Sequence, residues 1–112
     1  MSKVCIKTNT MFTSVNYDDI IRWLANKALP VRIPTLGRRR YIDVSLQGGL
    51  ICVQGSNGVV KVFSREYWRN ICGIIDRVTP ISDRGKTRNY NINADRFAPS
   101  VPAICRQYCE EN

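Results

Sequence analysis

The side chains best suited to catalysis are mostly missing from this chain. It contains no histidine, which excludes Ser-His-Asp and Cys-His nucleophile systems, HNH-type nuclease sites and histidine-containing zinc sites. Of its five cysteines, Cys105 and Cys109 are one helical turn apart and could face one metal ion. A zinc site needs two further ligands, however, and the chain has no Cys-x-x-Cys knuckle. We therefore expect reduced thiols and no metal.

The carboxylates and the glycine-containing segments do not indicate an active site either. Asp18 and Asp19 are placed to cap a helix, and Asp43 is a single acid on an expected strand. The tripeptide Gly85-Lys86-Thr87 has the ending of a phosphate-binding P-loop, but Pro80 occupies the position of the first glycine of that motif. The sequence therefore predicts a non-enzymatic protein without a cofactor.

Basic side chains are the strongest remaining signal. Lys and Arg number 17 against 9 Asp and Glu, which gives a net charge of +8. Such a charge favours a polyanionic partner, nucleic acid first and an acidic protein surface second; the alternative is a solvated basic surface spread over several faces. Arginine and aromatic side chains interleaved on a sheet can neutralise phosphates and stack on bases. The predicted nucleic-acid-binding residues are Arg38, Arg39, Arg40, Tyr41, Gln54, Lys61, Arg84, Lys86 and Arg88.

The elements that must position these residues form one domain of 112 residues. Asn16 is a typical helix N-cap, and Pro30 should end the helix that follows it. Residues 27–40 contain no acid and are stiffened by Pro30 and Pro34, so we expect a basic loop that delivers its arginines to the first strand.

Three strands are expected next, at about 40–46, 50–55 and 59–64. They should form an antiparallel meander with one buried face and one exposed face. The pair Asn57-Gly58 is typical of a two-residue type I′ turn.

The register of the second hairpin follows from that turn. A two-residue turn places Val53 opposite Val62 and Gln54 opposite Lys61. The side chains of Gln54 and Lys61 should then share the less apolar face of the sheet with Tyr41.

Two more helices complete the predicted fold. Ser64 should cap a helix at about 65–78, and Ser100 should cap the last helix after a long polar loop at 79–99. The fold class is therefore α+β: an N-terminal helix, a three-stranded antiparallel meander, a second helix, a long loop and a C-terminal helix. The apolar positions expected to be buried on the two later helices are Trp68, Ile71, Ile75, Val78, Val101, Ile104, Cys105 and Tyr108.

This order of elements is similar to that of double-stranded-RNA-binding domains, and to the sheet-plus-helix modules with which some plant transcription factors and phage-type integrases bind DNA. The segment from Leu29 to Ile42, LPVRIPTLGRRRYI, also resembles the arginine-rich wing of excisionase-type proteins. The second helix departs from the RNA-binding pattern, because it opens with Ser64-Arg65-Glu66-Tyr67 instead of a basic cluster. The likeness of element order alone does not assign a family.

The function predicted from the sequence is non-enzymatic binding of nucleic acid, with DNA favoured over RNA. The alternative is a phage or mobile-element protein that inhibits a nucleic-acid-directed defence complex, of the anti-CRISPR or anti-restriction type, by protein–protein binding. A third interpretation is an accessory subunit that docks through its C-terminal helix. No segment has the pattern of a signal peptide or of a membrane span, so we expect a cytoplasmic protein, or one in the host cytoplasm or nucleoid if it is of phage origin.

Overall fold

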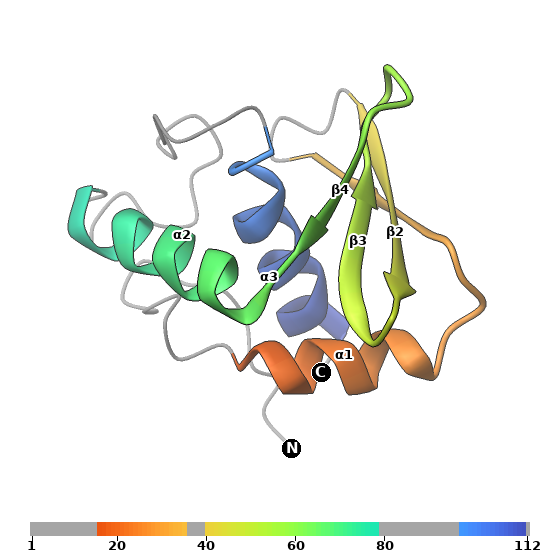
Figure 1. Cartoon of the computed structure of the whole chain (residues 1–112), viewed down its shortest axis with the longest axis horizontal. Helices are drawn as coiled ribbons and strands as arrows, with labels where there is room; N and C mark the ends of the chain where they lie inside the picture. Colours follow the sequence, from red (N-terminus) through yellow and green to blue (C-terminus); the bar gives the residue numbers. More distant parts are fainter. Residues whose placement is uncertain (1–15, 36–39, 79–96, 112) are drawn as a thin grey trace.

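The computed structural model describes residues 16–35, 40–78 and 97–111. It confirms the α+β class: one antiparallel sheet carries helices before and after it (Figure 1). The elements, in chain order, are α1 (Tyr17–Ala25), β1 (Val31–Pro34), β2 (Tyr41–Gln47), β3 (Leu50–Gln54), β4 (Val60–Phe63), α2 (Arg65–Val78) and α3 (Ser100–Glu111).

The described sheet has four strands in the order β1-β2-β3-β4, one more than the sequence predicted. The additional strand, β1, lies inside the segment that was expected to be a loop, so that expectation is wrong for Val31–Pro34. Ile33 pairs with Ile42 and is fully buried. The strand is short and ends at a proline. An edge strand tolerates proline where the backbone nitrogen faces away from the neighbouring strand, because no N–H is needed there for pairing. Because of these features, the alternation of buried and exposed side chains in β1 was not recognised from the sequence.

The hairpin between β3 and β4 also differs from the prediction. The Gly55 N–H donates to Val59 O at 3.0 Å and the Gly58 N–H donates to Gly55 O at 3.0 Å. Gly58 has a φ of +86°, which glycine adopts at no steric cost. The loop is therefore one residue longer than a type I′ turn, with a glycine bulge closing it.

That extra residue changes which side chains share a face. Gln54 pairs with Val60, and Val53 pairs with Lys61, so the predicted pairing of Gln54 with Lys61 is wrong. Because side chains alternate along a strand, a slip of one residue exchanges the two faces of β4. Phe63 consequently points into the core and is fully buried, while Val62 is 39% exposed.

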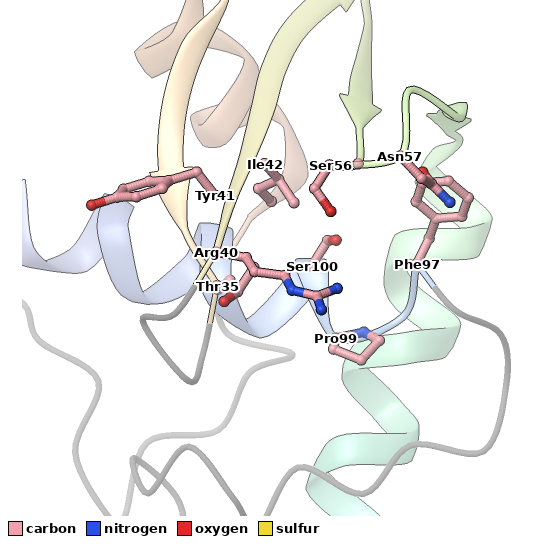
Figure 2. A pocket seen from close by; sticks show the side chains of 11 residues that line it. Thr35, Arg40, Tyr41, Ile42, Ser56, Asn57, Phe97, Pro99 and Ser100 are labelled. Atoms are coloured by element: carbon pink, nitrogen blue, oxygen red, sulfur yellow. The ribbon is translucent and has the colours of Figure 1, made fainter.

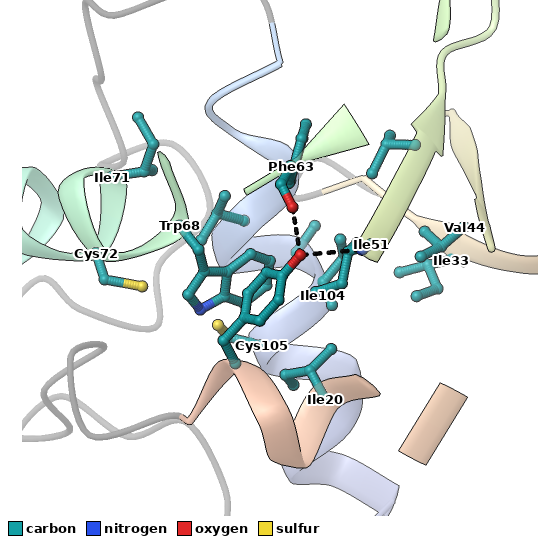
Figure 3. Close-up of a cluster of buried hydrophobic side chains, with 14 of the residues drawn as sticks. Ile20, Ile33, Val44, Ile51, Phe63, Trp68, Ile71, Cys72, Ile104 and Cys105 are labelled. Carbon is teal, nitrogen blue, oxygen red and sulfur yellow. Dashed lines mark hydrogen bonds between the residues drawn. The ribbon is translucent and has the colours of Figure 1, made fainter. Parts of the chain in front are cut away.

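Helices α1 and α3 pack against the same face of the sheet, and α3 lies in the middle of the molecule (Figures 1 and 3). Its residues 101–106 are all buried, as expected for a helix covered by the sheet on one side and by α1 and α2 on the others. Arg106 is buried within it, and its guanidinium donates to Thr35 O at 2.9 Å. This contact holds the segment after β1 against the helix.

Tyr17 links α1 to the sheet. Its hydroxyl donates to Phe63 O and accepts from the Ile51 N–H at 3.0 Å (Figure 3). Ile51 and Phe63 face each other across β3 and β4, so the hydroxyl satisfies two backbone groups that lie inside the protein. Burial raises the pKa of the Tyr17 hydroxyl, and the hydrogen bond from Ile51 only partly offsets this effect.

The predicted helix caps are confirmed at two positions. The Asn16 side chain accepts from the Asp18 N–H at 2.7 Å, and the Ser64 hydroxyl accepts from the Tyr67 N–H at 3.0 Å. Helix α1 ends at Ala25 with Asn26 as its C-cap, several residues before the proline that was expected to stop it. The Asn26 amide closes this end by donating to Arg22 O at 2.9 Å.

Candidate nucleic-acid interface

The face of the sheet that points away from α1 and α3, here called the outer face, carries a row of paired side chains that is polar on β1, β2 and β3 and apolar on β4. Arg32 pairs with Asp43, Asp43 with Gln54, and Gln54 with Val60. Paired residues in neighbouring strands project to the same side. The row therefore presents a cation, a carboxylate, an amide and an exposed valine side by side.

Tyr41 and Arg32 form the aromatic and cationic part of this face. Tyr41 is 52% exposed, and the Arg32 guanidinium carbon lies 5.9 Å from the centre of its ring. Arg32 also contacts the Asp43 carboxylate, with 3.4 Å between Nε and Oδ1. An exposed ion pair of this kind contributes only about 0–1 kcal/mol, so Arg32 can exchange it for another anion at little cost.

A hollow of about 390 Å³ lies at the end of this face, where β2 begins and the β3–β4 turn folds over. We call it the sheet-end hollow. Three of the predicted binding residues line it together: Arg40, Tyr41 and Gln54. Two arginines, Arg32 and Arg40, and one carboxylate, Asp43, are among its described lining residues, so cations outnumber anions there. The lining residues are Arg32, Arg40, Tyr41, Asp43, Gln54, Gly55, Ser56 and Gly58.

Lys61 does not belong to this group, which corrects the prediction that it shares a face with Gln54. It lies on β4 opposite Val53, on the side of the sheet that faces the helices. Its ammonium lies 4.7 Å from the centre of the Tyr67 ring on α2. A cation held over an aromatic ring has a local structural role there.

The remaining predicted residues lie outside the described part of the chain: Arg38, Arg39, Arg84, Lys86 and Arg88. Arg38 and Arg39 precede Arg40 in the connection from β1 to β2. The ends of that connection are held together, because the Thr35 N–H donates to Arg40 O at 2.9 Å. The contribution of these five residues to binding stays a prediction.

Sequence reasoning missed three residues that help to form this end of the sheet: Arg32, Ser56 and Ser100. Arg32 lies on the strand that was taken for a loop. Ser56 is in the hairpin turn, and Ser100 begins α3, beside a second hollow described below. The Asn57-Gly58 pair marked the first segment as a hairpin turn, and Ser100 was predicted to cap the last helix. That these two segments meet is decided by the packing of α3 across the sheet, which has no local signature in the sequence.

Asp18 and Asp19, which were expected to cap the first helix, have structural roles. Asp18 accepts from the Arg65 guanidinium, with 3.1 Å between Nε and Oδ1, and this hydrogen bond lowers the pKa of its carboxyl. Asp19 forms an ion pair with Arg22 along α1. Both acids thus stabilise the first turn of α1, and Asp18 also joins α1 to the start of α2.

The described cysteines are buried as thiols: Cys52, Cys72, Cys105 and Cys109. Within the described ranges, no three His, Cys, Asp or Glu side chains cluster closely enough to hold a metal ion. None of the helices in those ranges is long and apolar enough to cross a membrane.

Comparison of the chain with protein-family models, with curated proteins and with solved structures found no significant match. Functional inference therefore rests on the chemistry of the outer face and of the sheet-end hollow.

Proposed function

We propose that this protein binds nucleic acid, with DNA favoured over RNA, and that the outer face and the sheet-end hollow form the contact surface. The observation that carries the proposal is the position of Arg40 and Tyr41. They are adjacent in the chain, both are exposed, and both line the same hollow beside Gln54. A guanidinium binds a phosphate through two parallel hydrogen bonds, and an exposed ring stacks on a base.

The charge of the whole chain supports this proposal. A net charge of +8 attracts a polyanion over distances of about a Debye length, roughly 10 Å at 0.1 M salt. Arg38 and Arg39 add two charges within two residues of Arg40. In the described part of the chain, the Arg40 guanidinium has no carboxylate partner that a phosphate would have to displace.

A protein partner is the second candidate function, and the edge strand β4 favours it. Val60 and Val62 on its outer face are 52% and 39% exposed. The far edge of β4 carries no further strand in the described sheet. An edge strand with exposed apolar side chains can accept an added strand from another protein. An inhibitor of a nucleic-acid-directed complex would use a surface of this kind.

The aromatic contact is tested by replacing Tyr41. We expect Tyr41→Ala to weaken binding to a labelled single-stranded oligonucleotide by about 5- to 150-fold, because stacking contributes about 1–3 kcal/mol per base. The matched control is Tyr41→Phe, which keeps the ring and should change affinity less than about twofold. Fluorescence anisotropy at one fixed salt concentration measures both variants.

Both replacements are at an exposed position, so neither should unfold the protein. If the wild type binds and Tyr41→Ala binds equally well, the ring does not contact the nucleic acid. If none of the three proteins binds, the edge of β4 becomes the leading candidate surface.

A further inference from the structure

A second hollow, of about 300 Å³, opens on the other side of Arg40, at the N-terminal end of α3 (Figure 2). We call it the helix-end pocket. It shares Arg40, Tyr41, Gly55 and Ser56 with the sheet-end hollow. Its walls come from the start of β2, the β3–β4 turn and the first turn of α3. The lining residues are Thr35, Arg40, Tyr41, Ile42, Gly55, Ser56, Asn57, Phe97, Pro99, Ser100 and Ala103.

The described lining of the helix-end pocket is electropositive. Among the described residues that line it, none is an acid and Arg40 is the one with a charged side chain. The guanidinium projects into the pocket and has no hydrogen-bond or ion-pair partner among the residues that are described. The N-terminus of the 12-residue helix α3 adds a partial positive charge of about half a unit.

Ser100 supplies a second, independent feature. The residue is only 9% exposed, and its hydroxyl points into the pocket (Figure 2). Within the described ranges that hydroxyl has no hydrogen-bond partner, and its oxygen is open to the pocket, so it is available to a bound ligand.

The first backbone N–H groups of α3 are not free to bind a ligand. The N–H groups of Ser100 and Val101 donate to the carbonyls of Phe97 and Ala98, at 2.9 and 3.1 Å, and Pro102 has no N–H. The helix therefore contributes its field, while the donors must be side chains. Figure 2 shows the Arg40 guanidinium and the hydroxyls of Ser56 and Ser100 converging on one region of the pocket.

We propose that the helix-end pocket binds a phosphate group through Arg40 and Ser100, with Ser56 as a third donor. A tetrahedral oxyanion accepts hydrogen bonds on several sides and is stabilised by both the guanidinium and the helix dipole. Phe97 and Ile42 add apolar surface to the lining beside the polar groups, which suits a sugar or base attached to the phosphate. The inference rests on the proposed function in one respect, namely that the phosphate belongs to nucleic acid.

Inorganic phosphate is the first probe, because its binding does not depend on the proposed function. Titration into the wild-type protein, followed by NMR, should shift the amide signals of Ser100 and Ser56 with half-saturation at or below ~10 mM. Chloride at equal ionic strength should leave them unchanged. Ser100→Ala and Arg40→Gln should each weaken phosphate binding about tenfold, since hydrogen bonds to a charged group are strong.

Arg69→Gln is the matched control. It removes the same charge from an exposed position on α2, and Arg69 lines neither the helix-end pocket nor the sheet-end hollow, so phosphate affinity should change less than about twofold. The proposal is overturned if phosphate causes no saturable shift at Ser100, or if the control weakens binding as much as Arg40→Gln does.

The source of the phosphate is identified with two oligonucleotides that differ only at the 5′ end. Tighter binding of the 5′-phosphorylated strand than of the 5′-hydroxyl strand, abolished by Ser100→Ala, assigns the pocket to a terminal phosphate. Equal binding of both strands, reduced equally by Ser100→Ala, assigns it to the internal backbone. If the protein binds inorganic phosphate but neither strand, the phosphate site is supported and the proposed nucleic-acid binding is contradicted. If it binds both strands with affinities that Ser100→Ala does not change, and inorganic phosphate causes no shift, nucleic-acid binding is supported and the phosphate site is contradicted.

Discussion

Replacing Arg38, Arg39 and Arg40 together with alanine should weaken binding to duplex DNA by about 100-fold at ~0.1 M salt. If each arginine neutralises one phosphate, the slope of log affinity against log salt becomes shallower by about 2.7, since each contact contributes about 0.9. The loss should be similar for unrelated DNA sequences, because phosphate contacts carry no base information. Anisotropy titrations at several salt concentrations measure both quantities.

Net charge alone would also lower affinity, so the experiment needs a charge-matched control. Arg22, Arg69 and Arg77 are exposed on α1 and α2, away from the sheet-end hollow. Replacing these three with alanine removes the same charge and should weaken binding much less. Equal losses in the two triple variants would show that the protein attracts DNA through its overall charge, and the surface around Arg40 would lose its special role.

Replacing Phe63 with alanine should lower the free energy of unfolding by about 3–5 kcal/mol. Phe63 is fully buried, and its ring centre lies 4.9 Å from that of Tyr67 and 6.4 Å from that of Phe97. Its removal leaves a cavity where the sheet, α2 and the start of α3 meet. Urea denaturation measures the change, and Phe63→Leu provides a milder variant if the alanine protein does not fold.

The neighbouring Val62 is the control, because it points to the outer face and is 39% exposed. Val62→Ala should cost less than about 1 kcal/mol. The register expected from a two-residue Asn57-Gly58 turn makes the opposite prediction, since it places Val62 in the core beside Val53. A large loss at Val62 with a small loss at Phe63 would contradict the observed pairing.

The sequence predicted the long, strongly patterned elements best. Helix α2 has the expected bounds because Ser64 supplies a cap and apolar residues recur with helical spacing from Trp68 to Ile75. Strands β2 and β3 were also expected, since alternation over Tyr41–Gln47 and the Gly48-Gly49 turn are local signals. Both glycines have positive φ there, at 59° and 78°.

The errors come from features that local patterns do not determine. β1 is four residues long, carries an arginine and ends in proline, so only its pairing with β2 makes it a strand. The β3–β4 register depends on whether the turn contains two or three residues, and Asn57-Gly58 is compatible with both. That one residue moved Lys61 from the outer face to the face that packs on the helices.

The candidate site was predictable in composition but not in arrangement. Arg40, Tyr41 and Gln54 were selected by residue type and by alternation, and the structure brings them together at one hollow. Ser100, by contrast, lies 60 positions after Arg40 in the chain. The two line one pocket because α3 crosses the sheet at this point, and no short-range rule specifies that contact.

The salt dependence of DNA binding by the unmodified protein tests whether it binds nucleic acid through phosphate contacts. Anisotropy titrations with labelled duplex and single-stranded DNA at ~50 and ~200 mM salt should show binding that weakens about 40-fold on duplex if three phosphates are contacted. No binding to either form at ~50 mM salt, or binding that is independent of salt, would contradict the account and favour a protein partner at the edge of β4.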